Sequence, residues 1–243
     1  MSYTMERWYS ATGQRFSMRK YGGAPEEADM AALEETARML SNDGVRLTLA
    51  ADAHVFKPIF LGGGKVKGTP SFAAVVYKGD ALMRCGYIGE SFILECTALG
   101  LGTCWLGGSY KKNVATAHMK LGGEERIAAV IAFGKPGEAY AGRPRKTLAA
   151  LTGLSQERLV ALPEWQQLAL SCARLAPSAI NAQPWEFHVE GDRLAIVRTS
   201  ANFGFGKLDQ GIAMLHTELG AAHGGMSGSW AIEGETAAFT PQA

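Results

Sequence analysis

The sequence predicts the same order of structural elements in both halves of the chain, and this repetition restricts the fold more than any other feature. Each half holds a helix, a loop, a strand and then a helix associated with glycine. The glycines have identical spacing, Gly89 to Gly102 in the first half and Gly211 to Gly224 in the second. Two explanations stay open: an internal duplication, or an α+β architecture that the halves merely share.

Apolar residues at helical spacing predict four helices, and acidic residues in the first turn of the first one favour its start. Alternating or continuous apolar segments predict the strands. The strand at 127–133 is apolar throughout and is therefore expected in the centre of its sheet. The segment 185–197 predicts a hairpin that turns at Gly191 and Asp192, and the residues beyond Ser227 show no strong pattern. The expected helices are 25–40, 89–101, 163–175 and 209–223, and the other expected strands are 46–51 and 71–77.

Glycine, proline and basic residues concentrate in the segment 134–150, which is the best candidate for a connector between the halves. A second glycine-rich loop is expected at 62–68. The composition fits one sizeable domain or two small ones, because 47% of the 243 residues are hydrophobic and 19% are charged.

Charge and hydrophobicity restrict the partners and the location of the protein. A formal net charge of +1 argues against nucleic acid or an anionic membrane as the partner. The longest apolar run, 127–133, is too short to span a bilayer, and the polar N-terminal residues lack the apolar core of a signal peptide. The four cysteines have neither zinc-ligand spacing nor a C-x-x-C pair. We therefore expect a cytoplasmic protein without a membrane, nucleic-acid or metal partner.

The first motif of chemical interest is the basic segment that runs from Arg15 to Tyr21. Arg15, Ser17 and Arg19 alternate, so in an extended chain they project to one side. Two guanidiniums and a hydroxyl on one side suit a phosphate and a polyol chain, because arginine offers forked donors to anionic oxygens. The alternative is a solvated basic terminus.

The second motif is the polar segment Ala176–Trp185, at the end of a helix and the start of a strand. Two prolines fix its backbone, and Ser178, Asn181 and Gln183 supply donors and acceptors, a pattern that indicates a bound polar ligand. The alternative is a structural turn in which Trp185 fills the core. A third motif, 86–90 followed by 100–108, is rich in glycine, which permits close approach of a planar ligand to the backbone.

Together the three motifs resemble the nitroreductase superfamily of flavoenzymes. The resemblance implies that Arg15, Phe16, Ser17 and Arg19 contact the phosphate and ribityl chain of FMN. It implies that the polar segment reaches the flavin through three of its residues, that Gly100–Trp105 forms a helix end near the ring, and that three backbone groups lie beside the flavin N5. A basic stretch after the last core strand would complete the phosphate site. The residues concerned are Pro177, Ser178 and Asn181 in the polar segment, Leu106, Gly107 and Gly108 beside N5, and Arg143, Arg145 and Lys146 in the basic stretch.

The order of the motifs departs from that of the usual family member, in which the Ala-Pro-Ser segment soon follows the Arg-x-Ser-x-Arg segment. Here the corresponding place, Ser41–Gly44, is short, and the Ala-Pro-Ser segment lies in the second half. This order resembles the fused branch of the superfamily, in which one chain imitates a dimer. It implies an α+β nitroreductase-like fold with a first half at 1–142, a degenerate second half at 143–243 and one composite flavin site, in a monomeric pseudo-dimer or a weak homodimer.

The implied activity is reduction of a nitroaromatic, a quinone or a similar electron-poor small molecule by NADH or NADPH in a ping-pong reaction at FMN. No catalytic side chain is expected, because the cofactor carries the chemistry. The lack of a Gly-x-Gly-x-x-Gly turn fits a nicotinamide that visits the flavin. The alternatives are a flavin reductase or dehalogenase on the same fold, or a non-catalytic FMN-binding protein. Cys104, near the expected flavin, is interpreted as a structural thiol, and His188 and His216 as bystanders.

Overall fold

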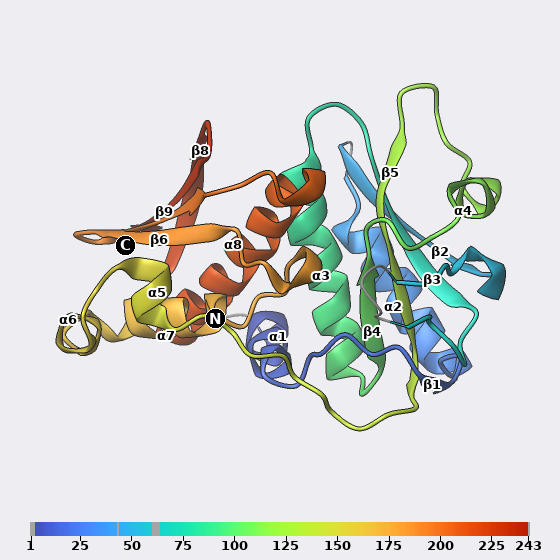
Figure 1. The fold of residues 1–243 in the computed structure, drawn as a ribbon, viewed down its shortest axis with the longest axis horizontal. Coiled ribbons are helices and arrows are strands. Elements are labelled where there is room, and N and C mark those ends of the chain that lie inside the picture. The colour runs from blue at the N-terminus through green and yellow to red at the C-terminus, as the bar shows by residue number, and fades with distance from the viewer. Residues whose placement is uncertain (1–2, 43, 60–63, 243) are drawn as a thin grey trace. The chain divides into compact units, whose positions relative to one another are not determined.

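The computed structural model describes residues 3–42, 44–59 and 64–242. The chain divides into two compact units (Figure 1). The central unit comprises Gln14–Arg143, and the terminal unit comprises Met1–Gly13 together with Pro144–Ala243. The N-terminal helix α1 (Tyr3–Thr12) thus belongs to the unit formed by the second half of the sequence.

An antiparallel sheet forms the centre of the central unit. Strand β5 pairs with β1, β3 and β4, and β3 pairs in turn with β2. The middle of β5 is fully buried, as is almost all of β3, which explains why residues 127–133 and 72–77 are apolar. The strands are β1 (Tyr21–Gly23), β2 (Val45–Ala51), β3 (Ser71–Tyr77), β4 (Gly102–Leu106) and β5 (Arg126–Pro136).

The two long helices α2 (Glu27–Leu40) and α3 (Leu82–Ala98) pack together in the central unit, and both contact the sheet. Helix α3 buries nearly every residue between Cys85 and Thr97, so it is a core helix and not an amphipathic surface helix. The helical elements are α2 (Glu27–Leu40), η1 (Ala53–Val55), α3 (Leu82–Ala98) and α4 (Lys112–His118).

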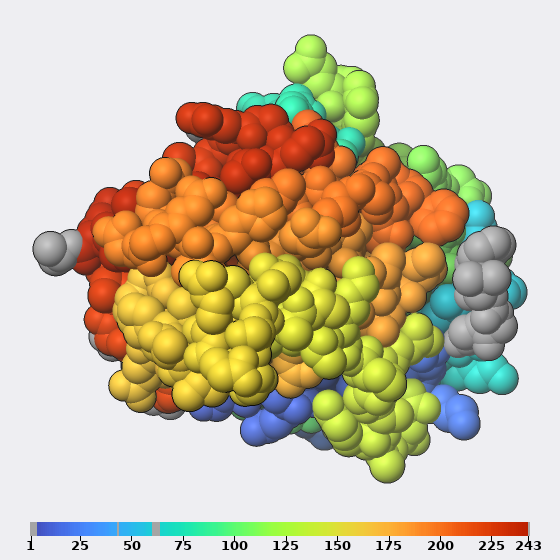
Figure 2. Space-filling view, turned by 60° about the vertical axis from the view of Figure 1, so that its left-hand side comes forward, coloured from blue at the N-terminus to red at the C-terminus, as the bar shows by residue number. Residues whose placement is uncertain are grey.

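The terminal unit combines an antiparallel sheet of order β6-β7-β9-β8 with a helical layer in which α7 and α1 pack on α8. Tyr9 of α1 stacks on His223 of α8 with ring centroids 3.9 Å apart, which fixes α1 in this unit. Figure 2 shows the face of the terminal unit where α5 lies against β6. The elements are α5 (Leu148–Thr152), α6 (Gln156–Val160), α7 (Glu164–Ala173), η2 (Ala179–Asn181), β6 (Trp185–Glu190), β7 (Arg193–Arg198), η3 (Asn202–Gly204), α8 (Gly206–His223), β8 (Ser227–Glu233) and β9 (Thr236–Gln242).

The α+β class is confirmed, and so are most of the expected elements. Helices α2 and α7, strands β2 and β3 and the β6–β7 hairpin lie where the sequence places them, and β5 is central in its sheet. Strand β5 continues to Pro136, so the expected connector begins later than 134. The expected loop 62–68 lies partly outside the described residues, as does Asp43 of the short segment Ser41–Gly44. Among the described helices, none has both the length and the apolar content that crossing a bilayer requires.

The predicted bounds of the helix at 89–101 are wrong at both ends, because α3 spans Leu82–Ala98. It begins at Leu82, because Cys85 and Ile88 continue the buried helical stripe of Phe92, and it ends before Gly100, whose φ of +78° stops it. Residues 102–106 are therefore strand β4 and not the end of a helix. Gly89 lies inside the helix because the Trp105 ring packs on it, and a Cβ there would be 2.2 Å from Cη2.

The glycine spacing shared by the halves does not mark corresponding helix ends, because Gly102 lies in strand β4 whereas Gly224 is the C-cap of α8. Gly211 is an interior residue of α8, which begins at Gly206 rather than at Asp209. Several other elements carried too little pattern to be expected, among them α1 and the β8–β9 hairpin beyond Ser227. Strand β8 is mostly exposed, so its side chains lack the apolar alternation that identifies a half-buried strand.

Candidate functional site

The basic segment of the central unit is fixed along strand β4. Ser17 forms a parallel bridge with Thr103, and the Met18 N–H donates to the Thr103 carbonyl over 2.8 Å. The Met18 side chain is buried, and its sulfur occupies the space that a Cβ on Gly102 would need. Glycine at 102 therefore lets the segment approach the strand closely.

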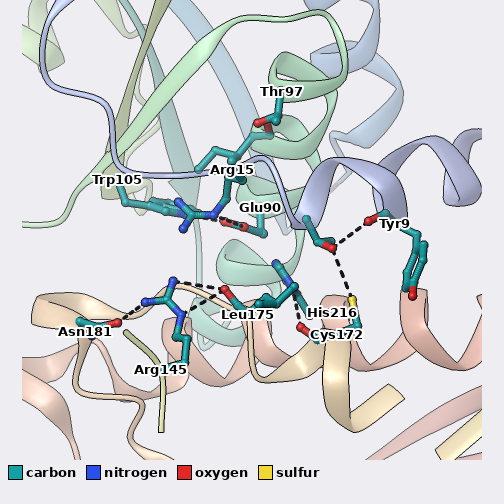
Figure 3. A network of polar contacts seen from close by, with 12 residues as sticks. Tyr9, Arg15, Glu90, Thr97, Trp105, Arg145, Cys172, Leu175, Asn181 and His216 are labelled. Atoms are coloured by element: carbon teal, nitrogen blue, oxygen red, sulfur yellow. Dashed lines mark hydrogen bonds and ion pairs between the residues drawn. The ribbon is translucent and has the colours of Figure 1, made fainter. Parts of the chain in front are cut away.

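Arg15 is a buried cation with only 7% of its surface exposed. Its Nε lies 3.7 Å from Oε1 of the fully buried Glu90, and Oε2 of Glu90 accepts a hydrogen bond of 2.7 Å from the Trp105 indole (Figure 3). The Arg15 Nε donates no hydrogen bond to any residue that the structure describes. A buried donor of this kind requires an acceptor, which a bound ligand can supply.

Arg19 and Arg143 are the other two cations of this region. The backbone N–H of Arg19 donates to Oε1 of Glu138 over 2.6 Å, while its buried side-chain Nε has no partner among the described residues. Burial raises the pKa of the Cys104 thiol to about 11, and the charges of Arg19, Arg15 and Arg143 act to lower it. All three guanidiniums therefore lie close enough to Cys104 to act on the same thiol, which stays protonated near neutral pH.

Polar and aromatic groups complete this arginine cluster of Arg15, Arg19 and Arg143. Phe16 is half-buried and meets the Tyr140 ring edge-on at 5.3 Å, and Ser17 is half-buried. The buried Thr103 hydroxyl has no partner among the described residues. Thr103 and Glu90 were not predicted as site residues, although both stand within the glycine-rich motif 86–90 and 100–108.

The backbone after β4 offers two free donors. Leu106 is buried at the end of the strand, whereas Gly107 and Gly108 lie beyond it. Within the described chain, the N–H groups of Gly107 and Gly108 have no hydrogen-bond acceptor. A Cβ added to Gly108 would meet nothing within 4 Å, so a ligand can approach the backbone from that side.

The polar segment of the terminal unit is held by its own hydrogen bonds. Pro177 is buried, the Ser178 hydroxyl accepts from the Gln183 N–H over 2.8 Å, and Oε1 of Gln183 accepts from the Lys146 N–H over 2.8 Å. Trp185 fills the core of this unit. The segment is therefore preformed by contacts within the terminal unit.

Arg145 and Asn181 bind each other in the same unit (Figure 3). Nη1 of Arg145 donates to Oδ1 of Asn181, and the amide nitrogen of Asn181 donates to the Pro144 carbonyl over 3.0 Å. Nε and Nη2 of Arg145 both donate to the Leu175 carbonyl, over 3.3 and 3.2 Å. The two arginines that the sequence analysis paired thus fall into different units, Arg143 in the central unit and Arg145 in the terminal unit.

A buried acid beneath the polar segment was also missed. Asp209 lies in α8, and its carboxylate accepts from the Ala179 N–H over 2.9 Å and from Nδ2 of Asn202 over 2.6 Å. Burial raises its pKa from 3.8 to about 6, against the lowering effect of these hydrogen bonds. The sequence showed only an acid at the start of a helix, which is usually exposed.

Comparison with known proteins places the chain in a family. A family model described as "Putative TM nitroreductase" matches residues 8–221. The crystal structure of a nitroreductase from Thermotoga maritima, itself described as putative, has a TM-score of 0.66 at 23% identity, and the match covers 96% of this chain and 92% of that one. No curated protein matches the sequence.

Two further solved structures are less similar. An FMN-dependent nitroreductase from Clostridium difficile has a TM-score of 0.45 at 16% identity, over 54% of this chain and 88% of its own. A protein described as a putative NADH dehydrogenase/NAD(P)H nitroreductase from Parabacteroides distasonis has a TM-score of 0.46 at 17% identity, over 58% of this chain and 94% of its own. The family model spans most of the chain, and the Thermotoga maritima structure shares its fold. The chain therefore belongs to the nitroreductase superfamily.

Proposed function

We propose that this protein is an FMN-dependent oxidoreductase that uses NADH or NADPH to reduce nitroaromatics, quinones or similar electron-poor small molecules, with reductant and acceptor binding in turn. Membership of the nitroreductase superfamily supports an oxidoreductase. When bound, FMN would supply the hydride transfer for which the protein itself needs no catalytic side chain.

The observation that carries the proposal is the arginine cluster of the central unit. The Nε atoms of Arg15 and Arg19 are buried without a hydrogen-bond partner among the described residues, and together with Arg143 they place three positive charges around Cys104. A phosphate group would satisfy these donors and compensate the charge, because arginine binds phosphate oxygens through charge-assisted hydrogen bonds.

The other groups of the central unit fit the rest of the cofactor. The hydroxyls of Ser17 and Thr103 lie on two bridged segments of the chain, and that of Thr103 lacks a partner in the described part of the protein, so they suit a polyol such as the ribityl chain. The N–H groups of Gly107 and Gly108, which have no acceptor among the described residues, can donate to a ring acceptor at the end of β4. Phe16 would shield the ligand from water. We assign Arg15, Ser17, Arg19, Arg143 and the backbone of Leu106–Gly108 to the cofactor on this basis.

For the terminal unit we propose that Pro177, Ser178 and Asn181 contribute to the same FMN, as the resemblance implies. Arg145 and Lys146 then act on the polar segment rather than on the phosphate, because their donors already bind Asn181, Leu175 and Gln183. In this proposal one chain imitates a dimer, binds one FMN, and works as a monomer or a weak homodimer.

The visible absorption spectrum of the purified protein tests the proposal. We expect flavin bands, or their appearance on titration with FMN, followed by anaerobic bleaching with NADH or NADPH and recovery with a nitroaromatic or quinone. Parallel lines in double-reciprocal plots would indicate alternating binding of reductant and acceptor. A colourless protein that does not bind added FMN would refute the proposal, and FMN binding without nicotinamide oxidation would identify a non-catalytic flavoprotein.

A further inference from the structure

Non-glycine residues with left-handed backbone conformations gather in two short segments of the terminal unit. Ile180, Asn181 and Gln183 have φ of 51°, 62° and 47°, and Asn202 and Phe203 have φ of 40° and 56°. Across the described residues, no other non-glycine position has this conformation. Side chains disfavour it, most strongly when they are β-branched or bulky. Ile180 is nevertheless 52% exposed and Phe203 76% exposed, so packing of their own side chains does not impose it.

One buried carboxylate connects the two segments. Asp209 is only 1% exposed; Oδ1 accepts from the Ala179 N–H, and Oδ2 accepts from Nδ2 of Asn202. The same Nδ2 also donates to the Ala179 carbonyl over 3.1 Å. Asp209 thus holds the backbone of Ala179, which precedes Ile180, and the side chain of Asn202, which precedes Phe203. A buried carboxylate is unfavourable unless hydrogen bonds compensate it, and here the compensating donors belong to the two segments.

We propose that Asp209 is a positioning residue that holds residues 179–183 and 202–203 in their left-handed conformations and so preforms the polar segment for flavin binding. The flavin part of this inference rests on the proposed function, whereas the conformational part does not. The polar segment has a second anchor, because Lys146 binds Gln183 and Arg145 binds Asn181. Loss of Asp209 should therefore loosen the Ala179–Ile180 end without releasing the whole segment.

The test compares Asp209→Ala and Asp209→Asn with a matched control, Gln210→Ala. Gln210 is the next residue of α8 and is equally buried, and its amide donates to the carbonyls of Ile196 and Glu235 over 2.9 and 2.8 Å. Its loss perturbs the same helix without removing a contact to either strained segment. Asp209→Asn keeps an acceptor for Ala179 but places an N–H donor opposite Nδ2 of Asn202. It is the milder change and therefore keeps the test possible if the alanine variant fails to fold.

Two quantities are measured on the full-length protein: amide hydrogen exchange without FMN, and the FMN dissociation constant by quenching of flavin fluorescence. We expect Asp209→Ala to raise exchange at 179–180 and 202–203 by about tenfold or more, the effect of losing a hydrogen bond to a charged group, with β3 and β5 unchanged. FMN should bind about tenfold more weakly, with Asp209→Asn intermediate. Gln210→Ala should change neither quantity beyond its effect on global stability.

The outcomes separate this inference from the proposed function. Equal exchange at both segments in Asp209→Ala, Gln210→Ala and the unaltered protein would overturn the positioning role, even if FMN binds. Faster exchange with unchanged FMN affinity would overturn the link between the segment and the flavin. Failure of the unaltered protein to bind FMN would refute the proposed function, while the exchange data would still decide whether Asp209 holds the two segments.

Discussion

Replacing Arg19 by alanine should weaken FMN binding strongly, whereas replacing Arg38 should not. The Arg19 side chain has a buried Nε without a partner within the described residues, so its removal leaves no protein group unpaired. The expected loss is one charge-assisted hydrogen bond, about 1.5–3 kcal/mol, or about tenfold to 150-fold in the dissociation constant. Arg38 is the matched control, because its exposed side chain on α2 pairs only with Glu35 in the described structure.

Arg15→Ala should weaken FMN binding to a similar extent but also destabilise the protein. The Glu90 carboxylate is fully buried and would lose the opposite charge of Arg15 while it keeps the hydrogen bond from Trp105, and removing one partner of a buried ion pair costs about 3–5 kcal/mol. The double variant Arg15→Ala/Glu90→Gln removes that charge but keeps an acceptor for Trp105. It should regain much of the lost stability without regaining FMN affinity.

The assay is titration of FMN fluorescence by each variant, with thermal unfolding of the flavin-free protein as the measure of stability. Increasing salt should reduce the affinity of the unaltered protein more than that of Arg19→Ala, because one cation fewer contacts the phosphate. Equal dissociation constants for Arg19→Ala and Arg38→Ala would refute the assignment of the phosphate to the arginine cluster.

Three further predictions concern stability and reactivity. Because the Asp209 pKa is raised from 3.8 to about 6, the folded protein keeps a proton on this carboxyl between these pH values, whereas the unfolded chain has released it. The contribution of Asp209 to the free energy of unfolding is therefore complete below pH ~4 and falls by about 3 kcal/mol as the pH rises through 6. Denaturation of Asp209→Asn at a series of pH values should lack this slope. Gly89→Ala should lower the free energy of unfolding by about 1–3 kcal/mol, because its Cβ meets the Trp105 ring at 2.2 Å, whereas Gly13→Ala, with nothing within 4 Å, should not; equal melting temperatures would contradict this. Cys104, with its pKa raised to about 11, should react with a thiol reagent far more slowly at pH 7 than free cysteine does, as mass spectrometry of the labelled protein would show.

Helices and strands with a regular pattern of apolar side chains were predicted correctly from the sequence. The prediction was wrong where glycines were taken to mark the end of a helix. Residues 72–77 of β3 and 127–133 of β5 are apolar because these parts of the strands are mostly buried on both faces, so their pattern is unambiguous. Gly86 and Gly89 suggested the start of a helix, yet they are interior residues of α3, and the Trp105 ring that fills the space above Gly89 is remote in sequence from the helix start. A tertiary contact of this kind leaves no local pattern.

The candidate site was predictable where charge and motif coincide. Arg15 and Arg19 were identified from their alternation, and the structure gives each a buried nitrogen without a partner in its described part. The partners of these residues were not predictable, because Glu90 and Thr103 reach the cluster only through folding of α3 and β4. Arg145 illustrates the same limit: the family resemblance implied that it contacts the phosphate, and its bonds to Asn181 and Leu175 are visible only in the folded chain.

The most direct test of the central claim is the number of FMN molecules that each chain binds, measured by equilibrium dialysis against flavin of known absorbance. If the chain imitates a dimer and the arginine cluster of the central unit holds the phosphate, as proposed, the protein should bind one FMN and lose it when Arg15 and Arg19 are replaced together. Two FMN molecules per chain, or one that persists in the double variant, would contradict the account.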